Sequence, residues 1–171
     1  MQIESIETPR LKGERIAIEH LNLLLAMGSN SLVMATMGGT WNQNETRNKI
    51  ESNCQQWHLY SHGQWIFFDK ANDLFVGRGG IRKVTVNGKE EVELGYALMP
   101  EFWGRELAVE IGKQALSIAF DDFNYSSVVC YTLVDNKRSE RVMQKIGFIF
   151  EQEIFHANYP HVLYRYQNPK L

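Results

Sequence analysis

Two apolar runs in the C-terminal half of the chain are each followed by a turn and a helical pattern. The first is an apolar strand over residues 94–98, which Pro100 ends, and the second is a β-branched run over residues 128–134. Residues 105–123 carry apolar side chains at helical spacing, and a further helix is expected between Asn136 and Gly147. Two parallel strands joined by a crossover helix bring both strand ends and both helix N-termini to one edge of a sheet, where open α/β sheets bind ligands.

The remaining patterns predict a mixed sheet that is covered by helices. Alternation of apolar and polar residues indicates strands over residues 11–18, 64–69, 74–86, 91–98, 149–155 and 162–166. Helical spacing indicates two short helices within residues 21–37 and a longer one over residues 44–60. Asn87-Gly88 predicts a hairpin with a type I′ turn, which needs positive φ at both positions. The whole chain, residues 1–171, is predicted to be one domain of the mixed α/β class.

Composition and charge narrow the possible partners. Hydrophobic residues make up 44% and charged residues 22% of the 171 residues, as is typical of globular proteins. The net charge of −2 and the lack of a long basic run argue against a nucleic-acid partner. No apolar run approaches the roughly 18 residues that a membrane span needs, so no membrane association is expected.

The cysteines and the start of the chain point to a cytoplasmic location. Cys54 and Cys130 lie far apart and lack the spacing of a disulfide framework or a zinc site, so we expect no metal and a reduced compartment. Residues 1–7 carry acids where a signal peptide would carry Lys or Arg.

Each strand-to-helix junction offers polar groups at the expected ligand-binding edge. The turn at residues 100–104 precedes a helix, whose first backbone N–H groups and positive dipole end attract anions such as phosphate. Asn136 and Ser139 open the second helix. Both features have simpler explanations, because a turn also separates a strand from a helix and the polar pair also caps a helix. Together, the junctions suggest an extended ligand that lies across two neighbouring strand ends.

A resemblance to a known family rests on three motifs. They are Gly95-Tyr96, Pro100-x-x-Trp103-Gly104-x-x-x-Ala108-x-Glu110 and Asn136-x-x-Ser139-x-x-Val142-x-x-Lys145-x-Gly147-Phe148. In combination they resemble the GNAT acetyltransferases. Thr8-Pro9-Arg10-Leu11 is similar to the opening of the RimJ/RimL-like branch, the ribosomal-protein N-terminal acetyltransferases, so the resemblance spans nearly the whole chain.

The resemblance implies a fold, a cofactor and a binding mode. The implied fold is a mixed, mostly antiparallel sheet that splays between its fourth and fifth strands and is flanked by helices. The implied donor is acetyl-CoA, with its diphosphate on the turn after the fourth strand and its pantetheine arm between the splayed strands. Backbone N–H groups around Ala97 and Leu98 are expected to polarise the thioester carbonyl. The other expected coenzyme-binding residues are Trp103, Gly104, Arg105, Glu106, Leu107, Ala108 and Asn136.

Two residues depart from the family pattern. The family's diphosphate turn reads Gly-x-Gly, whereas this chain has Gly104-Arg105-Glu106, and a carboxylate beside a diphosphate repels it unless the side chain points away. Met143 stands where many members carry a tyrosine that protonates the departing thiolate, and a thioether has no proton to donate. The resemblance implies Ser139 as the substitute.

An amine attacks a thioester only when it is deprotonated, which calls for a general base. Glu93, two residues before Gly95, is the expected base, acting directly or through water, and Glu91 on the same face is a weaker candidate. The alternative for Glu93 is an outward carboxylate near a Lys or Arg. Arg78 and Arg82 are predicted to be solvated surface residues.

One cysteine and three tryptophans are expected to serve in packing and not in catalysis. Cys130 lies in the middle of a strand and is expected to be a small core residue. Trp41, Trp57 and Trp65 are expected to pack in the core or at the surface, and the alternative is a place in the acceptor pocket.

Three functions remain open from the sequence. The favoured one is acetyl transfer to the N-terminal α-amine of a protein or peptide, because an α-amine with a pKa of ~8 needs less help than a lysine with a pKa of ~10.4. The second is acetylation of a small amine such as a polyamine or an antibiotic. The third is a coenzyme-binding regulatory module with impaired catalysis, which Glu106 and Met143 motivate. A homodimer is compatible with all three.

Overall fold

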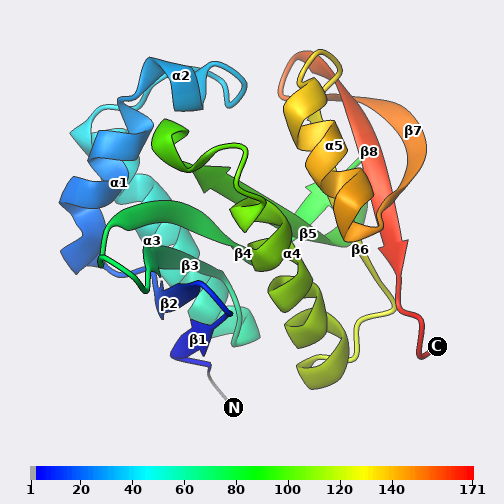
Figure 1. The fold of residues 1–171 in the computed structure, drawn as a ribbon. Helices are drawn as coiled ribbons and strands as arrows, with labels where there is room; N and C mark the ends of the chain where they lie inside the picture. The colour runs from blue at the N-terminus through cyan, green and yellow to red at the C-terminus, as the bar shows by residue number, and fades with distance from the viewer. Residues whose placement is uncertain (1–2) are drawn as a thin grey trace.

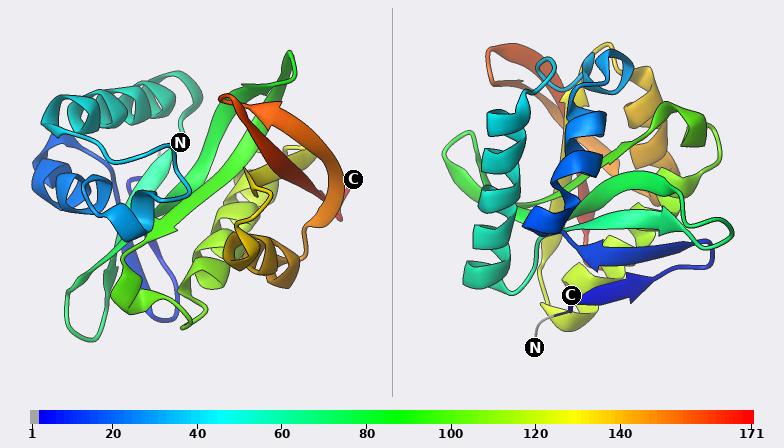
Figure 2. Two further views of the ribbon diagram at one scale, coloured as in Figure 1. Left: turned by 90° about the horizontal axis from the view of Figure 1, so that it is seen from above. Right: turned by 90° about the vertical axis from the view of Figure 1, so that its left-hand side faces the viewer.

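The computed structural model describes residues 3–171, which form one mixed sheet with helices on both faces (Figures 1 and 2). Residues 1 and 2 of the predicted domain lie outside the described residues. The strands are β1 (Ser5–Glu7), β2 (Leu11–Arg15), β3 (Gln64–Asp69), β4 (Phe75–Val86), β5 (Lys89–Leu98), β6 (Ser127–Leu133), β7 (Ile149–His156) and β8 (Tyr159–Gln167). The helices are η1 (Ile18–His20), α1 (Leu21–Gly28), α2 (Ser31–Met34), α3 (Gln43–Tyr60), η2 (Pro100–Phe102), α4 (Leu107–Ser117), η3 (Ile118–Asp122) and α5 (Lys137–Ile146).

The sheet has the order β1-β2-β3-β4-β5-β6-β8-β7, and neighbouring strands are antiparallel except for β5 and β6. These two strands are parallel and share a single register pair, Glu93 with Val129. The register stops there while both strands continue, so they part toward their C-terminal ends. The predicted fourth and fifth strands are β5 and β6, and both the mixed sheet and its splay are confirmed. The three-residue strand β1 was not predicted, because so short a segment carries almost no alternation.

Helices cover the two faces of the sheet in separate groups. Seen from above, α1 and α3 lie on one side of the sheet, and α4 and α5 lie on the other (Figure 2). The apolar face of α4 packs on the sheet because Leu107, Ile111 and Ala115 recur at helical spacing, and each is buried. Trp57 and Trp65 are fully buried with ring centroids 5.0 Å apart, which confirms that they are packing residues.

Most predicted element boundaries hold to within a few residues, and the exceptions have local causes. The helix expected from Arg105 begins at Leu107, because Gly104 and Glu106 have φ values of 75° and 61° that a helix does not allow. That helix passes into one π-helical segment, η3. The strand expected to reach Ile18 ends at Arg15, and η1 begins at Ile18.

Caps and turns agree with the sequence. Asn42 and Glu45 form a capping box at the start of α3, and Gly147, with φ of 114°, ends α5. Asn87 and Gly88 have φ values of 49° and 74°, as the predicted type I′ turn requires. Within residues 3–171, no helix is both long enough and apolar enough to span a membrane.

Candidate active site

The C-terminal ends of β5 and β6 and the N-termini of α4 and α5 meet at the opening between the two strands (Figure 1). Side chains of β5 alternate between the sheet faces. Ala97 packs with Met27 and Met34 of α1 and α2, whereas Tyr96 packs in the core that contains α4. Glu93 has the parity of Ala97, so it faces the same side as α1 and α2.

The backbone of β5 presents peptide groups to the opening. The N–H of Met99 donates to the carbonyl of Val76 on β4 at 2.9 Å. By the alternation of an antiparallel ladder, the N–H of Ala97 also points to β4, whereas the N–H of Leu98 points to the side of β6. The carbonyl of Leu98 accepts a hydrogen bond from Nε1 of Trp103 at 2.9 Å. Of the two predicted oxyanion donors, Leu98 is the one with its N–H directed into the opening.

The turn after β5 leaves the first N–H groups of α4 without a side-chain cap. Glu106 occupies the N-cap position with φ of 61°, and its side chain makes no capping hydrogen bond. Its carboxylate is 60% exposed and forms an ion pair with Lys145 of α5, which lowers the pKa of Glu106. The carboxylate that the sequence places beside the expected diphosphate site therefore has a neutralising partner.

Arg105 and Trp103 are held by contacts within this turn. Nη2 of Arg105 is 3.7 Å from Oδ2 of Asp69, and its guanidinium lies over the ring of Phe102. The guanidinium of Arg138, in the first turn of α5, lies 3.9 Å from the ring centroid of Trp103. This cation–π contact joins the turn after β5 to the start of α5.

Asn136 is engaged within the protein as a helix cap. Its Oδ1 accepts the N–H of Ser139 at 3.3 Å, and its Nδ2 donates to Oγ1 of Thr132 at 2.8 Å. The structural explanation of Asn136 is confirmed, and its contact with the pantetheine arm stays a prediction.

Ser139 lies beside Tyr96, a residue of the motifs for which the sequence predicts no role. The hydroxyl oxygens of Ser139 and Tyr96 are 2.9 Å apart, and the Tyr96 hydroxyl also lies 3.2 Å from the carbonyl oxygen of Ser139. Burial raises the pKa of Tyr96 well above its usual value, so this hydroxyl keeps its proton at neutral pH. Met143 is fully buried in the core. The hydroxyls of Ser139 and Tyr96 thus form a contacting pair that can donate protons, whereas the side chain of Met143 cannot.

Glu93 is buried and paired with an arginine. Its side chain is 7% exposed, and its Oε2 accepts from Nε of Arg82 at 2.5 Å. A Cβ built on Gly95 would lie 4.0 Å from the other oxygen, Oε1, which therefore faces the space above Gly95. Burial and the charge of Glu93 raise the pKa of Tyr131 on the neighbouring strand β6, and the Tyr131 hydroxyl is also hydrogen-bonded to the Glu93 side chain. Glu93 therefore has the expected arginine partner and a tyrosine partner as well.

Of the two arginines of β4 that the sequence predicts to be solvated, Arg82 is exposed, with 45% of its side chain accessible, whereas Arg78 is half-buried. Arg82 is engaged with Glu93, and Nη1 of Arg78 donates to Oε1 of Gln64 at 2.5 Å. Both point to the face that carries Glu93, because residues 78 and 82 have equal parity on β4 and Arg82 is paired with Glu93 across the strands.

Other titratable residues have structural roles. Glu91, the weaker base candidate, pairs through both of its oxygens with Arg165 at 2.8 and 2.9 Å. Cys130 is buried, which raises its thiol pKa and confirms its place in the core. Cys54 and Cys130 are both free. Residues 3–171 contain no group of His, Cys, Asp and Glu side chains that is suited to a metal ion.

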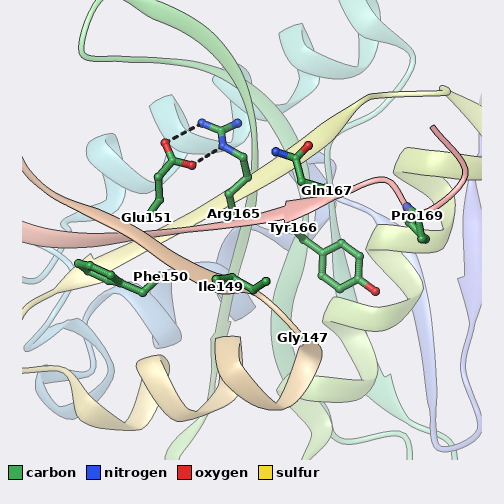
Figure 3. Close-up of a pocket in the computed structure, with 8 residues that line it drawn as sticks. All are labelled: Gly147, Ile149, Phe150, Glu151, Arg165, Tyr166, Gln167 and Pro169. Carbon is green, nitrogen blue, oxygen red and sulfur yellow. Dashed lines mark hydrogen bonds and ion pairs between the residues drawn. The ribbon is translucent and has the colours of Figure 1, made fainter.

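A shallow hollow of about 420 Å³ lies elsewhere, along β7 and β8 and the end of α5 (Figure 3). The ion pair between Arg165 and Glu151 stands at its side, with Oε2 of Glu151 2.5 Å from Nε of Arg165. None of the predicted catalytic or coenzyme-binding residues lines it. Its lining residues are Gly147, Ile149, Phe150, Glu151, Arg165, Tyr166, Gln167 and Pro169.

Comparisons of the sequence identify relatives of the chain. The family model described as the acetyltransferase (GNAT) domain matches residues 10–149. YkkB of Bacillus subtilis (strain 168) is 27% identical over 132 residues, which cover 77% of each chain. The FsC-acetyl coenzyme A-N(2)-transacetylase of Aspergillus fumigatus is 25% identical over 162 residues, covering 88% of this chain and 67% of that protein.

Solved structures share the fold. An acetyltransferase from Agrobacterium tumefaciens superposes with a TM-score of 0.85 at 22% identity, covering 98% of this chain and 96% of that chain. A ribosomal L7/L12 α-N-protein acetyltransferase, RimL, in complex with coenzyme A, superposes with a TM-score of 0.80 at 16% identity, covering 96% and 98%. At these identities the likeness concerns the fold alone.

Proposed function

Because the chain belongs to the GNAT acetyltransferase family and is an acetyl-CoA-dependent acyltransferase, we propose that it acetylates the N-terminal α-amine of a protein or peptide. In this reaction the amine nitrogen bonds to the thioester carbonyl carbon, the carbon–sulfur bond breaks, the amine loses a proton and the thiolate gains one. The observation that carries the proposal is the placement of Oε1 of Glu93 beside Gly95 on one face of β5 and of the Tyr96–Ser139 hydroxyl pair on the other. Base and acid then flank the opening in which the thioester is proposed to lie.

The proposed coenzyme site follows the turn after β5. The uncapped start of α4 supplies backbone donors for a diphosphate at residues 103–108, which is the chemistry that a helix N-terminus offers an anion. The N–H of Leu98, directed to the opening, is proposed to polarise the thioester carbonyl. Ala97 and Asn136 are proposed to border the pantetheine arm from β5 and from the start of α5.

The contacts of Glu93 favour an α-amine as the acceptor. One oxygen of Glu93 already accepts a hydrogen bond from Arg82, so the other oxygen, which faces Gly95, is the one proposed to receive the proton of the amine. An α-amine with a pKa near ~8 is partly neutral at physiological pH, so much of it needs no deprotonation by the base. A lysine with a pKa near ~10.4 is almost fully protonated and depends on the base far more. The likeness to RimL, an α-N-protein acetyltransferase, supports the same choice.

Two alternatives have their own support. The Aspergillus relative carries the name of an N(2)-transacetylase, which favours a smaller amine as the acceptor. Glu106 and Met143 favour a coenzyme-binding module with impaired catalysis, although Lys145 neutralises Glu106 and the Tyr96–Ser139 pair supplies protons.

Titration calorimetry with acetyl-CoA, combined with thiol release in the presence of an amine panel, separates these functions. We expect coenzyme binding, turnover of peptides with free N-termini and little turnover of polyamines or aminoglycosides. Glu93→Gln should lower kcat by roughly 100-fold, the usual scale of general base catalysis, with coenzyme affinity retained. Binding without turnover of any amine would favour the module, and turnover restricted to small amines would favour the second alternative.

We also propose a cytoplasmic location, which the two free thiols support. We further propose that the protein forms a homodimer. Light scattering, which measures the molar mass in solution, tests this.

A further inference from the structure

A buried hydrogen-bond donor without an acceptor lies beside Glu93. Gln64 at the start of β3 is 6% exposed, and its Oε1 is used by Arg78. Its Nε2 is buried without a hydrogen-bond partner among the described residues. A Cβ built on Gly95 would lie 2.8 Å from this nitrogen, so the nitrogen is directed at the same space over Gly95 that Oε1 of Glu93 faces. A buried amide donor without an acceptor is rare in folded proteins and calls for a missing partner.

Arg78 has no ion pair of its own among residues 3–171. Arg78 pairs with Ala97 across the strands, and no carboxylate in residues 3–171 lies within 4.0 Å of its guanidinium. Glu93 is already bound to Arg82. Burial and the nearby charge of Arg82 lower the pKa of Arg78 to about 10 against the opposing effect of Glu93, and Arg78 is still protonated at neutral pH. Two arginines thus share one carboxylate, so a further anion that binds beside Arg78 is stabilising.

An aromatic wall with a second cation completes the cluster. The guanidinium of Arg78 lies 5.7 Å from the ring centroid of Trp41, and Nζ of Lys49 lies 5.4 Å from the same centroid. Lys49 has no carboxylate partner in the described part of the chain. Trp41 is half-buried, so part of its ring remains available to a substrate. The cluster therefore combines two cations, a buried amide donor and an apolar surface.

We propose that Arg78 and Gln64 bind a carboxylate of the acceptor, so that the preferred substrates are N-terminal α-amines with an acidic side chain at the first or second residue. The inference rests on the proposed function and specifies its substrate class. A planar guanidinium with free donors matches a carboxylate, and the Gln64 amide beside it adds a further N–H. The carboxylate lies close to the reacting amine because Nε2 of Gln64 and Oε1 of Glu93 face the same space. Polyamines and aminoglycosides, which carry only positive charge, are repelled by Arg78 and Lys49.

The test compares peptides that begin Asp-Ala or Ser-Asp with matched peptides that begin Asn-Ala or Ser-Asn. With the wild-type protein, kcat/KM for the acidic peptides should be about 10- to 100-fold higher, the range expected for a hydrogen bond to a charged group. Arg78→Met should abolish this preference mainly through KM, and its melting temperature should be unchanged or higher because a part-buried charge without an ion pair of its own is removed. Arg47→Met, at an exposed arginine of α3, is the control and should keep the preference.

Titration calorimetry of the same peptides in the presence of coenzyme A makes the inference independent of turnover. If no peptide is acetylated, the proposed function fails, whereas tighter binding of the acidic peptides that Arg78→Met abolishes would still support the carboxylate site. Equal binding of acidic and amide peptides by the wild-type protein would overturn the inference. A preference that survives Arg78→Met would overturn it as well.

Discussion

Ser139 and Tyr96 act on the same proton in this account, because their hydroxyl oxygens are 2.9 Å apart at the opening. Ser139→Ala should lower kcat by roughly 100-fold, as expected for loss of proton donation, with coenzyme affinity retained. Tyr96→Phe should also lower kcat, and the double variant should lose less than the two single effects combined, since both residues serve one step. Thiol release measures kcat, and Ser117→Ala, at an exposed serine of α4, is the control. If Ser139→Ala keeps the wild-type kcat, the role of Ser139 is limited to the first turn of helix α5.

His62 makes the stability of the fold depend on pH. It is fully buried, with its Nε2 2.7 Å from the hydroxyl of Tyr125, and burial lowers its pKa from 6.5 to about 4. Between pH 6.5 and 4 the His62 imidazole is protonated in the unfolded chain and neutral in the folded chain. The free energy of unfolding should therefore fall by ~3 kcal/mol as pH drops through this range. Urea unfolding at pH 7 and pH 4.5 measures the change.

A matched pair of variants isolates this contribution from that of the carboxylates. His62→Gln should show a smaller loss of stability between the two pH values than the wild type, whereas His58→Gln, at an exposed histidine of α3, should not. An identical pH dependence in His62→Gln and the wild type would refute the role of His62.

The sequence identifies some site residues and not others for a physical reason. Ser139 and Glu93 stand in local patterns, a helix start and a strand, that are readable from neighbours along the chain. Tyr96 contacts Ser139 across 43 positions, and Arg78 contacts Gln64 across 14, so these pairings depend on strand register and on the splay. Register across a sheet is set by long-range packing, which no local pattern contains.

At the level of elements, the start of α4 tests the departure from the family's glycine pattern. Glu106 holds φ of 61°, a conformation that costs a residue with a side chain roughly 1–2 kcal/mol and glycine little. Glu106→Gly should therefore stabilise the fold and, by removing a carboxylate from the proposed diphosphate site, tighten coenzyme A binding measured by calorimetry. Glu106→Gln removes the charge without freeing the backbone and separates the two effects. Unchanged affinity in both variants would mean that the side chain points away from the diphosphate.

The sequence pattern predicts helix α4 as a whole but not the residue at which it begins. The apolar spacing of residues 107–119 predicts α4 and its buried face, yet its first residue is set by the positive φ of Glu106, which no propensity suggests. Asn87-Gly88 and Gly147 were predictable because their backbone conformations favour those residue types. The short strand β1 exists through its pairing with β2 and has no pattern of its own.

At the scale of the molecule, one sheet links both halves of the chain, since β3 and β4 pair next to β5 and β6. We propose that residues 1–171 form one domain. Urea unfolding should then give a single transition that is the same by far-UV circular dichroism and by the fluorescence of the four tryptophans, of which Trp57 and Trp65 are fully buried in the core. Two separated transitions would contradict a single cooperative unit.

The arrangement of the whole molecule places the proposed base and acid on opposite faces of one opening, which is the basis for direct transfer between two bound substrates. The most direct measurement offers acetyl-CoA and a peptide with a free N-terminus and an internal lysine, beside the same peptide with a blocked N-terminus, and locates the acetyl group by mass spectrometry. The account predicts acetylation at the α-amine of the free peptide and none of the blocked one. Acetylation of the lysine in both peptides, or of neither peptide while small amines are acetylated, would contradict it.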